Sequence, residues 1–248
     1  MRAVLTLAAA VIAAARPAAA DPAGARVLTV PTAWLPASGA ASATLGLDHR
    51  RDGSAIAGYG IGGLAELELG ADTDVRGCTD CTMRPAPVWL GRAAFRIGAR
   101  QGAWFAGMPA VVLGVRTAFA ALGGAVPEPR ASDAYAVASR DLGVIRLHAG
   151  IDAIAASVGG RRSAARLRPL AAVEIHPPMY PRSSLLGDIA WLPELDAQHG
   201  PALGWLLGIG VRYQAFSWAS IDLAVRARQG EPLDGTTVLV RFNALARP

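Results

Sequence analysis

Short stretches of the chain after Pro36 alternate between apolar and polar residues with a period of two, and clusters of Gly, Pro, Asp or Ser separate them. Leu67 and Leu69, for example, alternate with Glu66 and Glu68. The period is typical of a β-strand with one apolar face. Twelve stretches follow it, eight clearly and the last four more weakly: 42–48, 65–72, 89–97, 111–116, 144–152, 205–213, 220–228, 237–242, 55–62, 134–140, 167–176 and 185–192. We expect about twelve strands of roughly ten residues, the length of a tilted membrane-spanning strand.

The polar face of these stretches carries Gly, small residues and isolated Arg, Asp and Glu, whereas the opposite face is a nearly uncharged band of Leu, Val, Ile and Ala. A β-barrel in lipid needs this arrangement, with the apolar face outward. Closure of the barrel also pairs every backbone N–H and C=O, which lipid cannot do. We therefore predict an all-β fold, a closed antiparallel transmembrane β-barrel of about twelve strands over residues 41–248. A soluble secreted all-β protein is the alternative, and it would bury the apolar face.

Connection lengths alternate along the predicted strands. With the N-terminus in the periplasm, the periplasmic connections are mostly short, and most external connections are longer. The expected short turns are 61–63, 99–102, 141–142 and 214–217, and the expected longer loops are 73–86, 118–132, 153–166 and 193–202. Aromatic residues fall at the strand ends, where a membrane barrel places its two aromatic girdles. The predicted girdles are Trp89, Trp191 and Trp205 outside and Trp104, Tyr213 and Trp218 inside.

The first 20 residues read as a secretory signal peptide. Arg2 is followed by an apolar stretch, and the small residues 18–20 precede Asp21. The alternative is an N-terminal membrane anchor, for which the stretch is short. Residues 21–40 then form a predicted periplasmic segment. We expect the mature chain in the outer membrane of a Gram-negative cell.

Charge adds little to this picture. The full chain has 24 basic residues, all of them Arg, and 19 acidic residues. Removing Arg2 and Arg16 leaves 22 against 19, a net charge of +3. No basic face is clustered in the sequence, so nucleic-acid binding is not expected. No cofactor or metal is expected. The predicted partners are outer-membrane lipid, the barrel-assembly machinery and a small polar solute.

Ionisable residues recur on the polar face of neighbouring predicted strands, with opposite signs side by side. The predicted lumen charge network consists of Glu66, Glu68, Arg92, Arg96, Arg116, Arg146, Glu174, Asp188, Arg212, Asp222, Arg226 and Arg241. It has two interpretations. The side chains form salt bridges that stiffen the barrel, or they form a constriction that selects charged solutes.

Two further residue sets bear on chemistry. Cys78 and Cys81 are the only cysteines, and in an exported chain they are best explained by a small disulfide in an external loop. A redox or metal role is the alternative. His148 and Asp152 share a strand face, but four residues along a strand separate them by about 13 Å. No catalytic motif of the GxSxG or HExxH type occurs, and we do not expect an enzyme.

Several segments resemble a pattern common in poorly characterised Gram-negative outer-membrane β-barrels, including the YjbH-like group. They are the sequence TAWLP at 32–36, LGL at 45–47, YGIGGLAELELG at 59–70, GVRY at 210–213 and IDLAVR at 221–226. The resemblance implies an exported barrel that the barrel-assembly machinery inserts. The chain departs from the pattern at its end, where Phe242 is followed by NALARP instead of closing the sequence.

Together these features predict a narrow channel for small polar solutes. The alternative is a non-conducting structural or envelope-assembly barrel with a plugged lumen, in which residues 21–40 help to close the periplasmic mouth.

Overall fold

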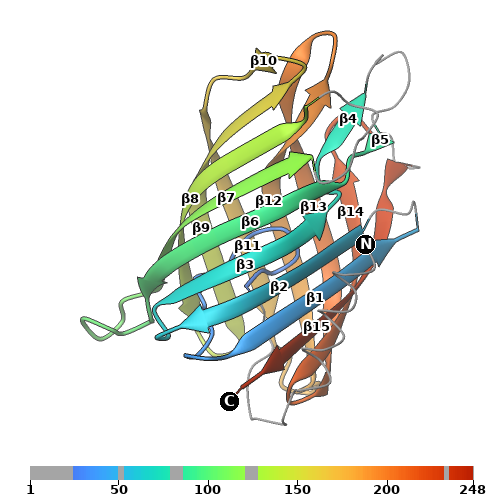
Figure 1. The fold of residues 1–248 in the computed structure, drawn as a ribbon. Helices are drawn as coiled ribbons and strands as arrows, with labels where there is room; N and C mark the ends of the chain where they lie inside the picture. The colour runs from blue at the N-terminus through green and yellow to red at the C-terminus, as the bar shows by residue number, and fades with distance from the viewer. Residues whose placement is uncertain (1–24, 50–52, 79–85, 121–127, 232–234, 248) are drawn as a thin grey trace.

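The computed structural model describes residues 25–49, 53–78, 86–120, 128–231 and 235–247. Within them, twelve long strands form the wall of a barrel (Figure 1). They are β1 (Ala41–Asp48), β2 (Gly53–Ile61), β3 (Ala65–Asp72), β6 (Leu90–Ala99), β7 (Ala110–Ala120), β8 (Arg130–Asp141), β9 (Ile145–Val158), β11 (Arg166–Ile175), β12 (Ser183–Asp196), β13 (Gly200–Phe216), β14 (Ala219–Arg228) and β15 (Thr237–Ala246). Three short strands lie at the end of the barrel opposite to the start of β1. They are β4 (Arg76–Cys78), β5 (Ala86–Pro87) and β10 (Arg161–Arg162).

The wall closes on itself. Each long strand pairs antiparallel with its neighbours in sequence, and β1 completes the ring by pairing with both β2 and β15, so that Leu45 lies between Ala55 and Phe242. The predicted fold class, a closed antiparallel barrel of twelve strands, is confirmed. Following the sequence-based expectation, the end where β1 begins is called periplasmic and the opposite end external.

Apolar side chains lie on the outer face of the wall and charged side chains on the inner face, as the period of two predicts. Leu67, Phe95 and Leu223 point outward, and Leu67 is 46% exposed. Their sequence neighbours Glu66 and Arg96 point inward, and each is 1% exposed. A soluble sheet protein would show the reverse arrangement, because burial of apolar surface drives its folding. The outer surface therefore suits lipid.

Some connections differ from the predicted lengths. The predicted loop at 193–202 is a short turn, because β12 and β13 stay paired as far as Asp196 and Gly200. Likewise β9 continues to Val158, since its small and apolar residues keep alternating. The predicted short turn at 99–102 extends over 100–109. The tight turn after β2 matches its prediction and uses Gly62 and Gly63, which both adopt positive φ angles that glycine tolerates best.

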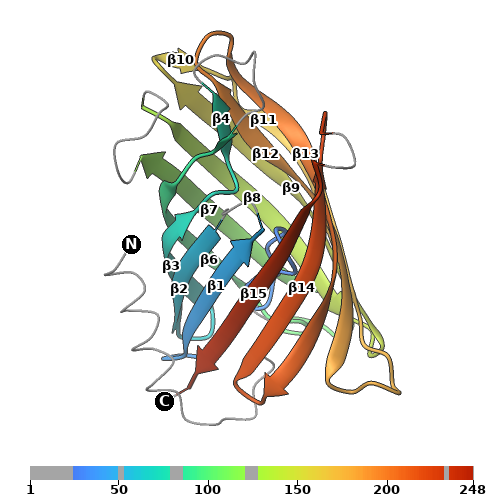
Figure 2. The same ribbon diagram turned by 90° about the vertical axis from the view of Figure 1, so that its right-hand side faces the viewer.

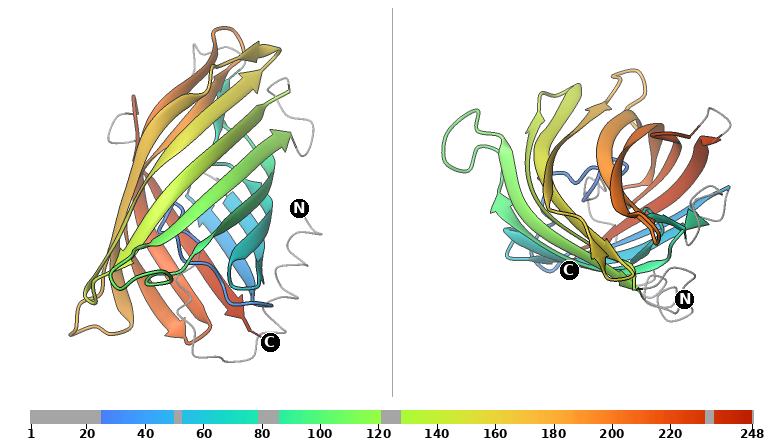
Figure 3. Two further views of the ribbon diagram at one scale, coloured as in Figure 1. Left: turned by 90° about the vertical axis from the view of Figure 1, so that its left-hand side faces the viewer. Right: turned by 90° about the horizontal axis from the view of Figure 1, so that it is seen from above.

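Residues 25–36 run inside the barrel, where Figures 2 and 3 show them as a blue loop surrounded by the wall. The alternative function predicts that residues 21–40 help to close the periplasmic mouth, but residues 25–36 of this segment lie deeper inside the barrel. The predicted signal peptide, residues 1–20, lies outside the described residues. Within the described part of the chain, no helix is long and apolar enough to cross a membrane.

Candidate functional site

The segment inside the barrel, residues 25–36, is called the plug. It folds into a tight hairpin, because Val27 N–H donates to Val30 C=O at 3.0 Å and Thr32 N–H donates to Ala25 C=O at 2.9 Å. Val27 and Val30 are fully buried against small and apolar wall residues such as Val137 and Ala224. The apolar residues of the hairpin thus fill the lumen, while most of its backbone polar groups need partners from the wall.

Asp188 on β12 binds the tip of the hairpin. Its Oδ2 atom accepts hydrogen bonds from three successive backbone N–H groups, those of Leu28 at 3.2 Å, Val30 at 2.9 Å and the intervening Thr29. Successive N–H groups in a turn form a concave site for an anion. The carboxylate is buried, so these bonds replace the water that it has lost.

Two arginines bind the carbonyl groups on the same hairpin. Arg212 donates to Val27 C=O at 2.9 Å, and Arg241 donates to the carbonyls of Val27 and Leu28. Both guanidinium groups also contact Asp222, with Arg212 Nε and Arg241 Nε each 2.8 Å from one of its oxygens. Asp222 thereby offsets the charge of two buried cations and orients them toward the plug.

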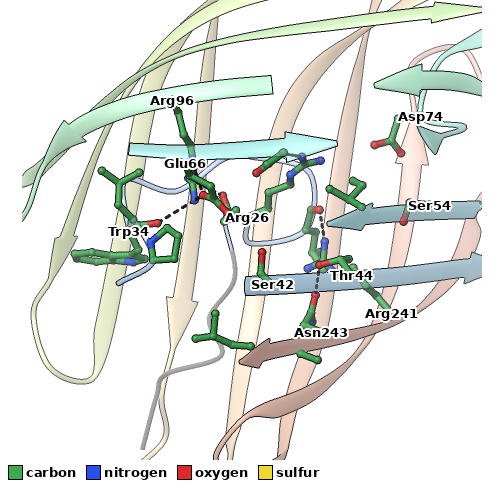
Figure 4. A pocket seen from close by; sticks show the side chains of 18 of the residues that line it. Arg26, Trp34, Ser42, Thr44, Ser54, Glu66, Asp74, Arg96, Arg241 and Asn243 are labelled. Atoms are coloured by element: carbon green, nitrogen blue, oxygen red, sulfur yellow. Dashed lines mark hydrogen bonds and ion pairs between the residues drawn. The ribbon is translucent and has the colours of Figure 1, made fainter. Parts of the chain in front are cut away.

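Arg96 and Arg26 hold the two ends of the plug (Figure 4). Arg96 on β6 donates to Thr32 C=O at 2.8 Å and to Trp34 C=O at 3.1 Å. Its Nε atom binds Glu66 on β3 at 2.6 Å. The plug supplies its own cation in Arg26, which reaches Glu68 at 2.5 Å. The wall charges therefore bind the backbone of the plug as well as one another.

A polar row beside the plug was not predicted from the sequence. Ser139 Oγ lies 2.7 Å from His148 Nδ1, and His148 Nε2 lies 3.5 Å from Glu174 Oε1. On the other side, His176 Nε2 lies 3.7 Å from Glu174 Oε2. The row has the residue types of a hydrolase triad. However, Ser139 is 0% exposed and its Oγ accepts Ala33 N–H at 2.7 Å, so here it anchors the plug.

A cavity of about 480 Å³ with both polar and apolar lining residues remains beside the plug. It follows β1 to β3 and β15, and its lining extends from Gln101 and Asp141 near the periplasmic end to Asp74 and Arg226 toward the external end. Ser42, Thr44, Ser54 and Asn243 add uncharged polar groups from the wall (Figure 4). The size suits a small polar molecule.

The chain after β3 turns into the external end of the lumen, where Asp74 lines the cavity. Asp74 binds Arg226 at 2.8 Å, and its carbonyl accepts a hydrogen bond from Arg228. Burial alone would raise the pKa of the Asp74 carboxyl, but the nearby Arg226 guanidinium holds that pKa well below its usual range. A buried apolar cluster lies near this end of the wall, and it consists of Val75, Val88, Leu90, Ala118, Ala131, Ala156, Val158 and Leu195.

The structure places all twelve residues of the predicted lumen network on the inner wall, buried or half-buried. Arg116 binds Asp133 at 2.5 Å, and Arg146 binds Asp141 at 2.8 Å, near opposite ends. Arg92 binds Asp72 at 2.9 Å. In the described part of the chain, no group of three His, Cys, Asp or Glu side chains is arranged to hold a metal ion.

The predicted girdle residues lie toward the strand ends. Trp89 precedes β6, Trp191 and Trp205 lie in the external parts of β12 and β13, and Tyr213 lies near the periplasmic end of β13. Trp218 stacks on Phe216 in the next turn, with ring centroids 5.4 Å apart. Trp104 lies beyond the wall in the turn at 100–109 and is 78% exposed.

Cys78 is disulfide-bonded at the end of β4. The predicted partner, Cys81, lies outside the described residues. The backbone of β4 pairs in parallel with β12, from Arg76 opposite Glu194 to Cys78 opposite Asp196. The cysteine is thus held at the external rim.

No family model and no curated protein matches this sequence. Among solved structures, the chain is similar to KdgM porin, with a TM-score of 0.51 and 4% identity over 84% of this chain and 99% of that one. It is also similar to an active-site mutant of outer membrane phospholipase A from Escherichia coli, with a TM-score of 0.47 and 10% identity over 90% and 94% of the two chains. None of these similarities is specific to the YjbH-like group. The chain has the fold of an outer-membrane β-barrel.

Proposed function

We propose that this protein is an outer-membrane β-barrel that is closed at rest by its own N-terminal hairpin and has a structural or envelope-assembly role without catalysis. Lipid surrounds the apolar outer face, and the barrel-assembly machinery inserts the chain. One observation carries the proposal: buried wall residues from β6, β8, β12, β13 and β15 bind the backbone of the plug. A constriction that selects solutes would leave such groups facing water.

The second candidate is the narrow channel for small polar solutes. The cavity of about 480 Å³ favours it, because the cavity follows much of the length of the barrel beside the plug and has polar groups along its lining. In this case displacement of the Asp74 segment at the external mouth would open the path, and the plug would stay in place. The two candidates thus differ in which segment has to move.

Planar-bilayer recording separates the candidates. We expect no conductance above background from the full chain and a clear conductance after deletion of residues 25–36. An equal conductance from both proteins would refute the plugged barrel and support the channel beside the plug. Because the deletion can impair folding, the full-length double variant Asp188→Ala, Arg241→Gln is recorded as well. Outer-membrane fractionation and heat-modifiable gel migration test the location and show that each variant is folded.

A further inference from the structure

The wall of the barrel is incomplete between β11 and β12. The two strands pair only where residues 171–175 of β11 face residues 185–189 of β12. Toward the external end, β11 stays paired with β9 back to Arg166, and β12 stays paired with β13 up to Asp196. Residues 166–170 and 190–193 therefore have no pairing across this junction, which is called the seam. Unpaired backbone groups are costly in lipid and require a polar partner.

The residues along the seam explain why it does not close. If the observed register continued, Pro169 would lie opposite Trp191 and Pro193 opposite Leu167. A proline has no N–H to donate, and it is therefore found at unpaired strand edges. Beyond the seam, the edge of β12 is taken by β4, which pairs with Glu194 to Asp196. The break in strand pairing is thus encoded in the two strands.

Arg168 lies in the unpaired stretch of β11 at the seam. Its register with Asp152 places it on the inner face of β11, whereas Trp191 has the parity of the outward residues Leu185 and Ile189. Even so, the Arg168 guanidinium carbon lies 4.8 Å from the centre of the Trp191 ring. Its Nε atom is buried and has no hydrogen-bond partner. A cation with a free buried donor therefore lies at the boundary between the inner and outer faces.

Further arginines gather at the external rim beside the seam. Arg130 on β8 and Arg162 on β10 both lie opposite Ser157 of β9, one on each side of it. Arg161 and Arg166 follow on the same edge of β9. All four are exposed, and within the described part of the chain none forms an ion pair. Four exposed positive charges are thus concentrated at this part of the rim.

We propose that the seam and its arginines bind a phosphate-bearing lipid of the external membrane leaflet. Guanidinium groups bind phosphate oxygens in pairs, and the headgroup would supply acceptors to Arg166, to Arg168 and to the unpaired backbone. The acyl chains would lie on the adjoining outer face, where Leu167 is 68% exposed. This apolar surface, continuous with the arginines, selects a lipid over a free anion. The proposal rests on the outer-membrane location proposed above.

Native mass spectrometry of the full mature chain in a neutral detergent tests the proposal. Three probes are titrated: phosphatidylglycerol, a diacylglycerol with the same chains, and inorganic phosphate. The test variant is Arg166→Gln, Arg168→Gln. The matched control is Arg140→Gln, Arg182→Gln, which removes two exposed arginines near the periplasmic end. Heat-modifiable migration is measured for every protein, so that loss of the barrel is distinguished from loss of the lipid site.

We expect the wild type and the control to retain phosphatidylglycerol. The test variant should bind it at least about tenfold more weakly, since two charge-assisted contacts are lost. Equal retention by the test variant would overturn the site. Equal binding of diacylglycerol would show that only the chains are bound and would also overturn it. Complete displacement of the lipid by millimolar phosphate would identify a free-anion site instead. Failure of all proteins to migrate as folded barrels would refute the proposed location.

Discussion

The contact between Asp188 and the plug allows the sharpest test of a closed lumen. Asp188→Ala removes the acceptor of three backbone N–H groups at the tip of the hairpin. A hydrogen bond to a charged group contributes about 1.5–3 kcal/mol, and we take the low end because the three bonds share one oxygen. Water that enters the emptied site recovers part of this sum. We therefore expect the state with the plug in place to be destabilised by about 3 kcal/mol. The equilibrium should shift about a hundredfold toward the open state, in which the plug has left its site.

Thiol labelling at Thr29 measures that shift. The Thr29 hydroxyl is buried without a hydrogen-bond partner, so Thr29→Cys should be tolerated, and Cys78 is already in a disulfide. The labelling rate of the cysteine by a water-soluble maleimide reports the open fraction. It should rise about a hundredfold in Asp188→Ala. The rise should be smaller in Asp188→Asn, which keeps one acceptor oxygen.

Asp133→Ala is the matched control. It removes a carboxylate from the inner wall that binds Arg116 and makes no contact with the plug. Its labelling rate should equal that of the wild type. The reasoning is refuted if Asp188→Ala labels no faster than this control. If both variants label faster than Thr29→Cys alone and by the same factor, a general loosening of the barrel is responsible, and the reasoning is refuted as well.

Three further outcomes follow from the structure. Gly208→Val should speed the same labelling, because a Cβ at Gly208 would lie 2.9 Å from Leu28 Cδ1 and overpacking costs about 1–3 kcal/mol; an unchanged rate would contradict the close fit. The lowered pKa of Asp74 means that its carboxylate stays charged, and its contact with Arg226 intact, until the pH falls well below 3.8. Limited proteolysis of the external mouth should therefore not change between pH 8 and pH 4, and increased cleavage in that range would refute this. Pro169→Val restores a backbone donor at the seam and should lower phosphatidylglycerol retention in the mass-spectrometry assay, whereas undiminished retention would separate the lipid site from the gap.

The period of two was enough to predict the wall. Once Leu67 is placed outward, Glu66 and Glu68 must point inward, and this inference needs no knowledge of the partner strands. The same rule shows why the predicted loops at 153–166 and 193–202 were too long. Both segments continue the adjoining strands, although small residues and prolines such as Pro193 are also typical of loops.

The plug could not be predicted in the same way. The wall residues that bind its backbone lie from 62 to 214 positions away in the sequence, and backbone atoms carry no sequence signal. The row from Ser139 through His148 to Glu174 depends on the register of three strands, which the sequence does not specify. The seam did leave a signal in Pro169 and Pro193, since two prolines inside neighbouring strands indicate an unpaired edge.

The wall holds the plug mainly through its backbone. Asp188, Arg96, Arg212 and Arg241 all bind main-chain atoms there. The lumen thus recognises the shape of a turn, and the identity of the side chains matters only where they fill space and at Arg26, which pairs with Glu68. Homologous chains could exchange much of this segment for unrelated residues and keep the same seal, provided that the turn and the three guanidinium groups and one carboxylate around it persist.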